Sequence, residues 1–519
     1  MRRIGIDVGG TNTDAVLIED GQVRGAVKAP TTLDVTGGIL DALGRLTATG
    51  ALKGKTLDAV MIGTTHFINA VVQRRWLTKI GALRIGLPAS ATLPPFCDWP
   101  EDLAEVVRGT VAMVEGGHEY DGRPFMPLDT ASVRRAAREM RTQGIRSVAI
   151  SSIFSPLDPS HEREAAAIVI DEIPDAAITC SSDLGRIGLL ERENAALLNA
   201  ALADLARDTI TAFEKAIASS GISAPLYITQ NDGTVVEAVQ AMRLPVYSFA
   251  SGATNSMRGA AYLSGIQDAI VADVGGTTTD LGQIRNGFPR EANAVVKVGG
   301  VRTLFRMPDL LSIGLGGGSH VSLDPLSVGP LSVGYRLTSD AVAFGGRQLT
   351  TSDVGIAVGL LTIGDRDKVS SIDQPTCQRV LDHIRTLIEE AVDRVKTEAG
   401  DSVLLAVGGG AFLIPDQLEG VSQVVCVPHG DCANAVGAAI AQVSGEVDQV
   451  FRDMTREEAI AAAEHLAAER AEAAGADRST LTVIDSEDIP IAYLPGNARR
   501  VRVRCVGDVA AGEPASDAA

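Results

Sequence analysis

Two nine-residue stretches of the chain carry nearly the same set of chemically useful side chains. Residues 6–14 read IDVGGTNTD, and residues 272–280 read ADVGGTTTD. In each stretch an aspartate ends a short apolar run, and two glycines follow it. Glycine permits a tight turn and lets the backbone approach another group closely. Successive N–H groups in such a turn form a nest for an anion, and a neighbouring carboxylate can hold Mg²⁺. The repetition predicts two facing hairpins with a nucleotide polyphosphate between them.

The residues of the doubled stretch have different expected roles. Asp7 and Asp273 are the expected catalytic and metal-binding carboxylates. Asp14 and Asp280 close the two stretches, where they either support the turn or face the terminal phosphate. One copy alone is equally consistent with an ordinary hairpin turn, and neither copy has the glycine spacing of a dinucleotide-binding or P-loop motif. The expected phosphate-binding residues are Gly9, Gly10, Thr11, Asn12, Thr13, Gly275, Gly276, Thr277 and Thr278.

Two further glycine clusters lie later in the chain. Gly408, Gly409 and Gly410 follow the apolar run SVLLAV. They are expected to let the backbone pass close to a nucleobase and ribose, and the alternative is a plain strand-to-helix turn. The cluster GLGGGS at 314–319 either lines the cleft or only forms a loop.

The elements that must position these residues alternate between strand and helix patterns. Apolar runs at 3–9 and 14–20 flank the first glycine turn and predict a hairpin. Helical spacing follows at 31–49, then a buried strand at 57–66 and a helix at 66–75. This alternation predicts a layered α/β lobe. A second α/β unit containing the second glycine turn is expected to run to about residue 445.

Proline-rich residues 88–100 begin an expected insertion. Residues 189–221 read as one long helix that ends at Gly221. Beyond residue 445, Thr455 and Glu458 form a predicted capping box for an Ala- and Glu-rich helix, and two strand-like runs follow.

Composition excludes several classes of protein. The net charge of −19 argues against nucleic acid as the main partner. No apolar run is long enough for a transmembrane helix, so no membrane association is expected. None of the six cysteines form a CxxC pair, and the expected setting is the reducing cytoplasm. His118, His161, His383 and His465 are expected at the surface, and no side-chain set has transition-metal spacing.

Taken together, the glycine turns resemble those of the actin, sugar kinase and heat-shock chaperone ATPase superfamily. More closely, the chain resembles the hydantoinase A/oxoprolinase family over nearly its whole length. This family includes N-methylhydantoinases, 5-oxoprolinases, caprolactamase-like enzymes and acetone carboxylase subunits. The stretches that carry the resemblance are IGIDVGGTNTDAVLI, GTTHFINAVVQR, FSPLDPSHEREAA, GLLERENAALLNAAL, QNDGTVV, VADVGGTTTDLGQI, GLGGGS and ANAVGAAIAQVSG.

The resemblance implies an α/β fold whose two actin/sugar-kinase-like lobes close on ATP and Mg²⁺. It also implies an inserted α/β substrate region and a small C-terminal appendage. We expect an N-terminal lobe with the insertion at 1–195, a second lobe at 196–445 and the appendage at 446–519. The implied chemistry is phosphorylation of an amide or carbonyl oxygen by ATP, in which positioning and charge neutralisation carry most of the catalysis.

Two polar turns are candidates for contacting the substrate. In GTTHFIN, Thr64, Thr65 and Asn69 are expected to bind it, and His66 to donate to an oxygen or move a proton. In TQNDGT, the expected substrate residues are Gln230, Asn231 and Asp232, with Asp232 orienting a ring N–H. Structural alternatives exist for both turns, because Thr-Thr-His also suits a helix N-terminus and Asn-Asp-Gly is a common turn sequence.

The expected function is that of an ATP-dependent hydrolase subunit that phosphorylates and opens a cyclic amide, such as a hydantoin, a lactam or 5-oxoproline. One alternative is the ATPase subunit of an acetone carboxylase-type enzyme. Another is a non-catalytic, ATP-switched binding protein of the actin or chaperone type. The chain has no segment resembling the family's B-type half, so a hydantoinase B-type or other partner subunit is expected, and a homo-oligomer is possible.

Overall fold

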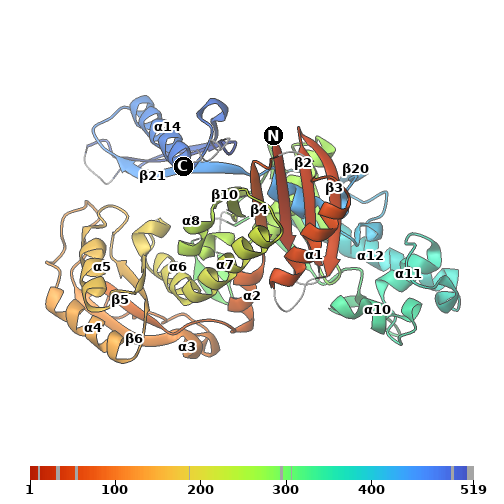
Figure 1. Ribbon diagram of the computed structural model, residues 1–519, viewed down its shortest axis with the longest axis horizontal. Coiled ribbons are helices and arrows are strands. Elements are labelled where there is room, and N and C mark those ends of the chain that lie inside the picture. Colours follow the sequence, from red (N-terminus) through yellow and green to blue (C-terminus); the bar gives the residue numbers. More distant parts are fainter. Residues whose placement is uncertain are drawn as a thin grey trace.

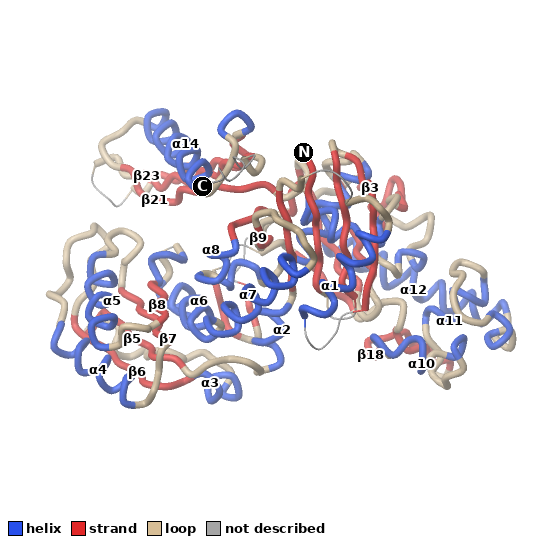
Figure 2. The backbone as a smooth tube through the Cα atoms, viewed as in Figure 1, coloured by secondary structure: helices blue, strands red, loops and turns tan. Residues whose placement is uncertain are grey.

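The computed structural model describes residues 1–9, 12–30, 35–52, 56–185, 187–292, 296–304, 307–492 and 496–510. Figures 1 and 2 show a central sheet with an inserted α/β unit at the lower left and a helix-and-strand unit above it. A second sheet and a group of short helices lie on the right.

The first sheet joins segments from both ends of the chain. Its strand order among the described residues is β22-β23-β21-β10-β9-β4-β1-β2-β3. The sheet therefore contains strands from all three expected parts of the chain, and the boundaries at 195 and 445 stay a prediction. The strands are β1 (Arg2–Val8), β2 (Asn12–Glu19), β3 (Gln22–Pro30), β4 (Ala59–Thr64), β9 (Leu226–Thr229), β10 (Thr234–Glu237), β21 (Gln442–Phe451), β22 (Thr482–Pro490) and β23 (Arg499–Gly507).

The second sheet has the order β13-β12-β11-β19-β20, with β16 paired to β12. It repeats the arrangement β3-β2-β1-β4-β9 of the first sheet. In both sheets the first two strands of the unit form an antiparallel hairpin, and the next two strands are parallel to its first strand. The strands are β11 (Ala269–Val274), β12 (Thr279–Arg285), β13 (Phe288–Pro289), β16 (Leu310–Ile313), β19 (Ser402–Val407) and β20 (Val421–Cys426).

Both faces of the β1–β2 hairpin are buried, which explains why its apolar runs are almost continuous. Leu17 packs into the core that α1 (Val35–Ala48) and α7 (Ala203–Ser219) cover. Val16, its neighbour on the opposite face, packs against α13 (Ala433–Ala439). Side chains alternate between the faces of a strand, so a sheet between two helical layers needs apolar residues at every position.

Helices α9 (Ser251–Ser264) and α13 lie between the two sheets and cross at very close range. A Cβ atom at Gly259 would lie 1.9 Å from the carbonyl oxygen of Ala433. A Cβ atom at Gly437 would lie 1.9 Å from the carbonyl oxygen of Asn255. The helices can approach this closely only because both positions lack a side chain.

The predicted insertion forms its own parallel sheet, in the order β6-β5-β7-β8. Its elements are β5 (Ile80–Leu87), α3 (Glu101–Val107), β6 (Arg108–Glu115), α4 (Thr130–Thr142), β7 (Ser147–Ser152), α5 (Ser160–Glu172) and β8 (Ala177–Cys180). His118 follows β6 in this unit. Its expected position at the surface is wrong, because the side chain is 1% exposed. The chain turns inward through Gly116 and Gly117, both at positive φ, and places the His118 ring 4.5 Å from that of His161.

The single long helix expected at 189–221 is also wrong. The structure has α6 (Leu189–Ala201) and α7, with a break at Leu202. The two helices have different partners: α6 packs against the inserted sheet at β7, and α7 packs against α1. Tertiary packing therefore overrides a continuous helical pattern. The predicted end is confirmed, since α7 is followed by Gly221 at φ 74°.

The C-terminal helix and strands are confirmed. Helix α14 (Arg456–Ala473) begins with the predicted capping box of Thr455 and Glu458. Ala459, Ala463, Ala467 and Ala471 form its buried stripe against β21 and β23. The remaining elements are α2 (His66–Gln73), α8 (Ala238–Arg243), β14 (Val296–Val298), β15 (Val301–Thr303), β17 (Ser319–Leu323), β18 (Leu326–Ser332), α10 (Leu337–Asp340), α11 (Thr351–Val358) and α12 (Gln374–Val395). Across the described ranges, no helix is both long and apolar enough to cross a membrane.

Candidate active site

The residues that flank the two glycine turns make matching backbone contacts. The Gly9 N–H donates to the Asn12 carbonyl at 3.1 Å, and the Gly275 N–H donates to the Thr278 carbonyl at 2.9 Å. Thr13 lies opposite Val8, as Thr279 lies opposite Val274. In the second turn Gly276, Thr277 and Thr278 are exposed, so their backbone is open to a ligand. Gly10 and Thr11 of the first turn lie outside the described residues.

The two turns bring Asp7 and Asp273 into electrostatic contact. Asp7 is 5% exposed, and the Asn434 side-chain amide donates to its Oδ2 at 2.7 Å. Burial, followed by the charges of Asp14 and Asp273, raises the pKa of Asp7 to about 7. Burial likewise raises the pKa of Asp273 to about 6, and a hydrogen bond from Ser256 opposes that rise. A raised carboxyl pKa means that the negative charge is disfavoured there, and a nearby cation would offset that cost.

The second oxygen of Asp7 bears directly on the metal assignment. Asp7 Oδ1 is buried and accepts no hydrogen bond. A buried carboxylate oxygen without a donor is costly, and a divalent cation would relieve that cost. Among the described residues no group of three or more His, Cys, Asp or Glu side chains is arranged around one point. A donor set of one or two carboxylates suits Mg²⁺, which keeps several waters and shares phosphate oxygens.

Asp14 and Asp280 occupy matching positions but have different partners. Lys28 Nζ lies 2.9 Å from Asp14 Oδ1 and also donates to the Asp431 carbonyl at 3.1 Å. Asp280 instead accepts a hydrogen bond from Ser312. Burial raises the pKa of both carboxyl groups, and Lys28 opposes the rise at Asp14. Asp14 is therefore paired with a cation, whereas Asp280 accepts its hydrogen bond from the neutral Ser312 hydroxyl.

The cluster at 408–410 packs against the second turn. Gly408 follows β19 at φ 87°, and a Cβ atom there would lie 2.5 Å from Asp273 Oδ1. The Gly410 N–H donates to the Val274 carbonyl at 2.8 Å. A Cβ atom at Gly409 would meet nothing within 4 Å. A side chain at Gly408 or Gly410 would therefore collide with the second turn, which explains glycine at both positions. Gly409 adjoins open space beside the turn.

The cluster at 314–319, whose role the sequence left open, supports the same turn from another side. The Gly317 N–H donates to the Gly275 carbonyl at 3.0 Å, and the Gly318 N–H donates to the Gly276 carbonyl at 2.7 Å. These bonds engage the carbonyl oxygens of the turn. The cluster also packs closely on the turn, since a Cβ atom at Gly316 would lie 2.6 Å from the backbone nitrogen of Thr277.

Three of the expected substrate residues, together with His66, lie at and just after the end of β4, the strand next to the one that carries Asp7. In the parallel register of β1 and β4, Val8 lies opposite Thr64. The His66 N–H donates to Thr64 Oγ1 at 3.1 Å, and Asn69 Nδ2 donates to Thr65 Oγ1 at 3.3 Å. Burial lowers the pKa of His66. Burial therefore favours the neutral form of its imidazole, a form that can accept a proton.

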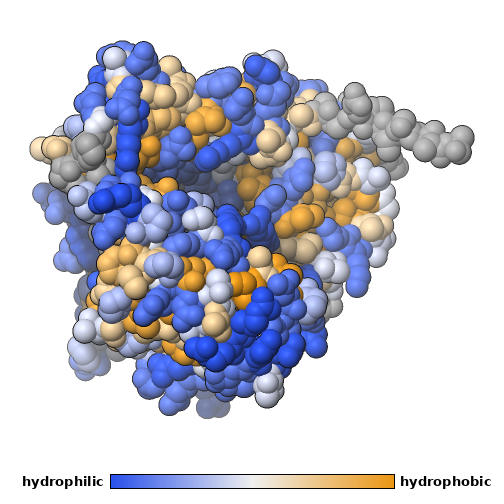
Figure 3. Space-filling view, turned by 90° about the vertical axis from the view of Figure 1, so that its left-hand side faces the viewer, coloured by the Kyte–Doolittle hydropathy of each residue, from blue (hydrophilic) through white to orange (hydrophobic). Residues whose placement is uncertain are grey.

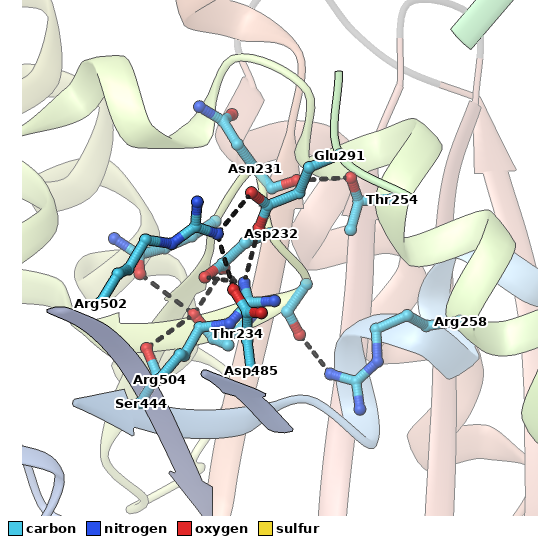
Figure 4. Close-up of polar contacts among 12 residues, drawn as sticks. Asn231, Asp232, Thr234, Thr254, Arg258, Glu291, Ser444, Asp485, Arg502 and Arg504 are labelled. Carbon is cyan, nitrogen blue, oxygen red and sulfur yellow. Dashed lines mark hydrogen bonds and ion pairs between the residues drawn. The ribbon is translucent and has the colours of Figure 1, made fainter. Parts of the chain in front are cut away.

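The other three expected substrate residues have protein partners, and Figure 4 shows Asn231 beside Thr254 and Asp232 beside Arg504. Asn231 is 2% exposed, donates from Nδ2 to the Val246 carbonyl at 3.1 Å and accepts from the Ala250 N–H at 2.7 Å. Asp232 pairs with Arg504 at 3.0 Å, and Gln230 accepts from Thr234. These contacts hold the start of α9 and the C-terminal strand in place. A substrate role for Gln230, Asn231 and Asp232 stays a prediction.

The same three residues line a hollow of about 440 Å³. Its other walls come from the insertion, including Asp183 and Leu184, and from β21, including Ser444 and Glu446. Figure 3 shows the molecule hollowed on this side, between the C-terminal unit above and the insertion below. The start of α9 separates this hollow from Asp7, because Asn231 binds Ala250 while Ser251 reaches Thr64.

Comparisons with known proteins agree with this architecture. Residues 3–173 match the family described as the hydantoinase/oxoprolinase N-terminal region, and residues 192–365 match the hydantoinase/oxoprolinase family. The chain belongs to the hydantoinase/oxoprolinase family.

Within this family, the chain is 28% identical over 497 residues to caprolactamase subunit alpha of Pseudomonas jessenii, covering 83% of this chain and 69% of the relative. It is 26% identical to the acetophenone carboxylase gamma subunit of Aromatoleum aromaticum, over 70% of this chain and 53% of the relative. It is also 26% identical to the acetone carboxylase beta subunit of Xanthobacter autotrophicus, over 69% of this chain and 54% of the relative. The chain thus spans about half the length of the two carboxylase subunits.

Solved structures show the same fold. The ATP-dependent caprolactamase from Pseudomonas jessenii superposes with a TM-score of 0.72 at 21% identity, over 97% of this chain and 87% of that one. The nucleotide-free acetone carboxylase structure superposes with a TM-score of 0.69 at 18% identity, over 99% of this chain and 89% of that one. The predicted two-lobed α/β fold is confirmed.

Three polar residues that contact the candidate site in this protein were not predicted from its sequence. Asn434 and Ser256 bind the two central carboxylates from the paired helices, and Lys28 binds Asp14 from β3. Asn434 stands near the start of the stretch ANAVGAAIAQVSG, where an amide side chain among small residues was the only available signal. Ser256 and Lys28 had no such signal, because their partners lie on other elements.

Proposed function

We propose that this chain is an ATP- and Mg²⁺-dependent hydrolase subunit that phosphorylates and opens a cyclic amide. The observation that carries the proposal is the pair of matching hairpins that bring Asp7 and Asp273 together, one from each sheet. Two glycine turns and two carboxylates facing one another suit a nucleotide polyphosphate and its metal. The caprolactamase relative supports the choice of acceptor, since its name describes lactam cleavage.

In this proposal the chain's own residues position the reactants. Asp7 and Asp273 would hold Mg²⁺, and that ion would supply charge neutralisation for the phosphate. The open N–H groups of the second turn, around Gly276 and Thr277, bind phosphate oxygens. The Gly408–Gly410 segment borders the adenosine.

The acceptor amide then lies at the end of β4, beside Thr64, Thr65 and Asn69. An amide carbonyl is a poor electrophile, and phosphorylation of its oxygen creates a leaving group. Neutral His66 can accept a proton there or pass one on.

We further propose that a partner subunit completes the reaction, because the caprolactamase and carboxylase relatives are themselves named as subunits. A second candidate is the ATPase subunit of a ketone carboxylase. It is favoured by the two carboxylase relatives, at 26% identity each. In that case the phosphorylated oxygen belongs to an enolate or to carbonate.

The deciding experiment measures ATP hydrolysis by the purified chain, alone and with a co-expressed partner subunit, against hydantoin, lactams and 5-oxoproline. Stimulation by a cyclic amide, abolished by EDTA and restored by Mg²⁺, supports the proposal. Stimulation only by a ketone with bicarbonate selects the carboxylase alternative. If no amide stimulates hydrolysis in either preparation, the amidase proposal is wrong.

A further inference from the structure

One exposed aromatic side chain lies beside the proposed acceptor site. The indole of Trp76 is 62% exposed and stacks on the imidazole of His66, with ring centroids 5.7 Å apart and planes inclined by 24°. The only other tryptophan, Trp99, is buried and donates to Asn194. An exposed indole with one face covered offers a large flat surface to another planar group.

The backbone holds Trp76 in an unusual conformation. Arg74 and Trp76 adopt φ values of 53° and 56°, in the left-handed region that non-glycine residues seldom enter. Arg74 is fixed there by Asp102, at 2.8 Å from Nε, and by the Gly299 carbonyl, at 3.1 Å from Nη2. The chain thus turns back after α2 and carries the indole over the first residue of that helix. Such conformations concentrate at functional sites and need support from their surroundings.

The residue that precedes His66 lies near Asp7, with Gly252 beside both. Thr65, the neighbour of His66, lies with Cγ2 3.3 Å from the point where Gly252 would carry a Cβ atom. That same point is 3.8 Å from Asp7 Oδ1. Asp7 Oδ1 is buried and accepts no hydrogen bond. Thr65, which directly precedes His66, therefore lies near the carboxylate oxygen that the proposed metal and phosphate would face.

We propose that Trp76, held against His66, is the stacking surface that receives the ring of the acceptor amide and directs its carbonyl oxygen toward Asp7. This inference rests on the proposed function and adds to it a residue that determines substrate position. An amide group is planar, and a flat ring presents a π face to the indole. A saturated seven-membered lactam is puckered and makes a smaller stacked contact. Trp76 thus favours planar rings over puckered ones.

The test compares Trp76→Ala, Trp76→Phe and the control Val72→Ala, which truncates another exposed apolar residue of the same segment. Steady-state ATP hydrolysis is measured with hydantoin and with ε-caprolactam, with the partner subunit present if the wild type requires it. In Trp76→Ala the KM for hydantoin should rise about tenfold, as expected for loss of one aromatic stacking contact. The KM for ATP should not change. Trp76→Phe should recover most of the loss, and Val72→Ala should behave as the wild type.

Tryptophan fluorescence gives a second readout. Hydantoin added to the wild type with a non-hydrolysable ATP analogue should quench the exposed indole. The same addition to Trp76→Phe, which retains only buried Trp99, should leave the emission unchanged.

The stacking role is overturned if Trp76→Ala keeps the wild-type KM for hydantoin while the wild type shows amide-stimulated hydrolysis. The proposed function itself, and this inference with it, is overturned if the wild type shows no amide stimulation at all.

Discussion

Asp7 and Asp273 occupy equivalent positions in two copies of one hairpin, and each lies directly opposite another aspartate. Asp7 is paired across its hairpin with Asp14, and Asp273 with Asp280. The hairpins belong to different sheets, yet the two central carboxylates interact electrostatically. The crossing of α9 and α13 holds them at this range, because Ser256 on α9 binds Asp273 and Asn434 on α13 binds Asp7.

Asp7→Asn and Asp273→Asn should each lower kcat for ATP hydrolysis by at least about 100-fold, as expected for removing a charge that acts on the transition state. Asparagine keeps the size of the side chain, so the hairpins should remain folded. The measurement is steady-state phosphate release, with circular dichroism as a check on folding. Asp208→Asn, on the exposed surface of α7, is the matched control. Near-normal activity in either hairpin variant would refute the metal assignment.

Asp7→Asn should also stabilise the protein at pH 8 in the absence of nucleotide and metal. The folded-state pKa of about 7 lies above the reference value of 3.8, so between these values the folded state binds more protons than the unfolded state. The resulting stability is fully present below about pH 4 and is lost as pH rises through about 7. Asparagine removes this penalty, with an upper bound of about 4 kcal/mol.

Urea denaturation at pH 5 and pH 8 measures this effect. The wild type should gain stability at pH 5 relative to pH 8 by more than Asp7→Asn does. If the free energy of unfolding depends equally on pH in the wild type and in Asp7→Asn, the pKa of Asp7 is not raised in the folded protein.

Gly259→Ala should destabilise the protein by about 3 kcal/mol or more, because its Cβ atom would lie 1.9 Å from the Ala433 carbonyl oxygen and push α9 from α13. Gly44→Ala is the control within α1, where a Cβ atom would meet nothing within 4 Å. That substitution should stabilise the protein by about 0.5–1 kcal/mol, since alanine suits a helix better than glycine. Thermal unfolding followed by circular dichroism measures the melting temperature of both variants. Similar changes in melting temperature in Gly259→Ala and Gly44→Ala would exclude a close helix crossing.

Asn231→Ala should lower stability by about 2–3 kcal/mol, because the buried Val246 carbonyl and Ala250 N–H both lose a partner. If the role of Asn231 is to hold the start of α9, the KM for the amide should change little in the folded fraction. Thermal unfolding and steady-state kinetics on the same preparation separate the two roles. A large rise in the amide KM with unchanged stability would instead support direct substrate contact.

The sequence by itself determined the local elements around the proposed site. Glycine spacing and flanking apolar runs predicted both hairpins, and the Thr455–Glu458 pair predicted the start of α14, because these features depend on residues a few positions apart. Only the tertiary structure decided the rest. It broke the helix at Leu202, buried His118, placed Asn434 and Ser256 on the carboxylates and laid Trp76 over His66. Each of these depends on contacts between elements distant along the chain, which local spacing does not encode.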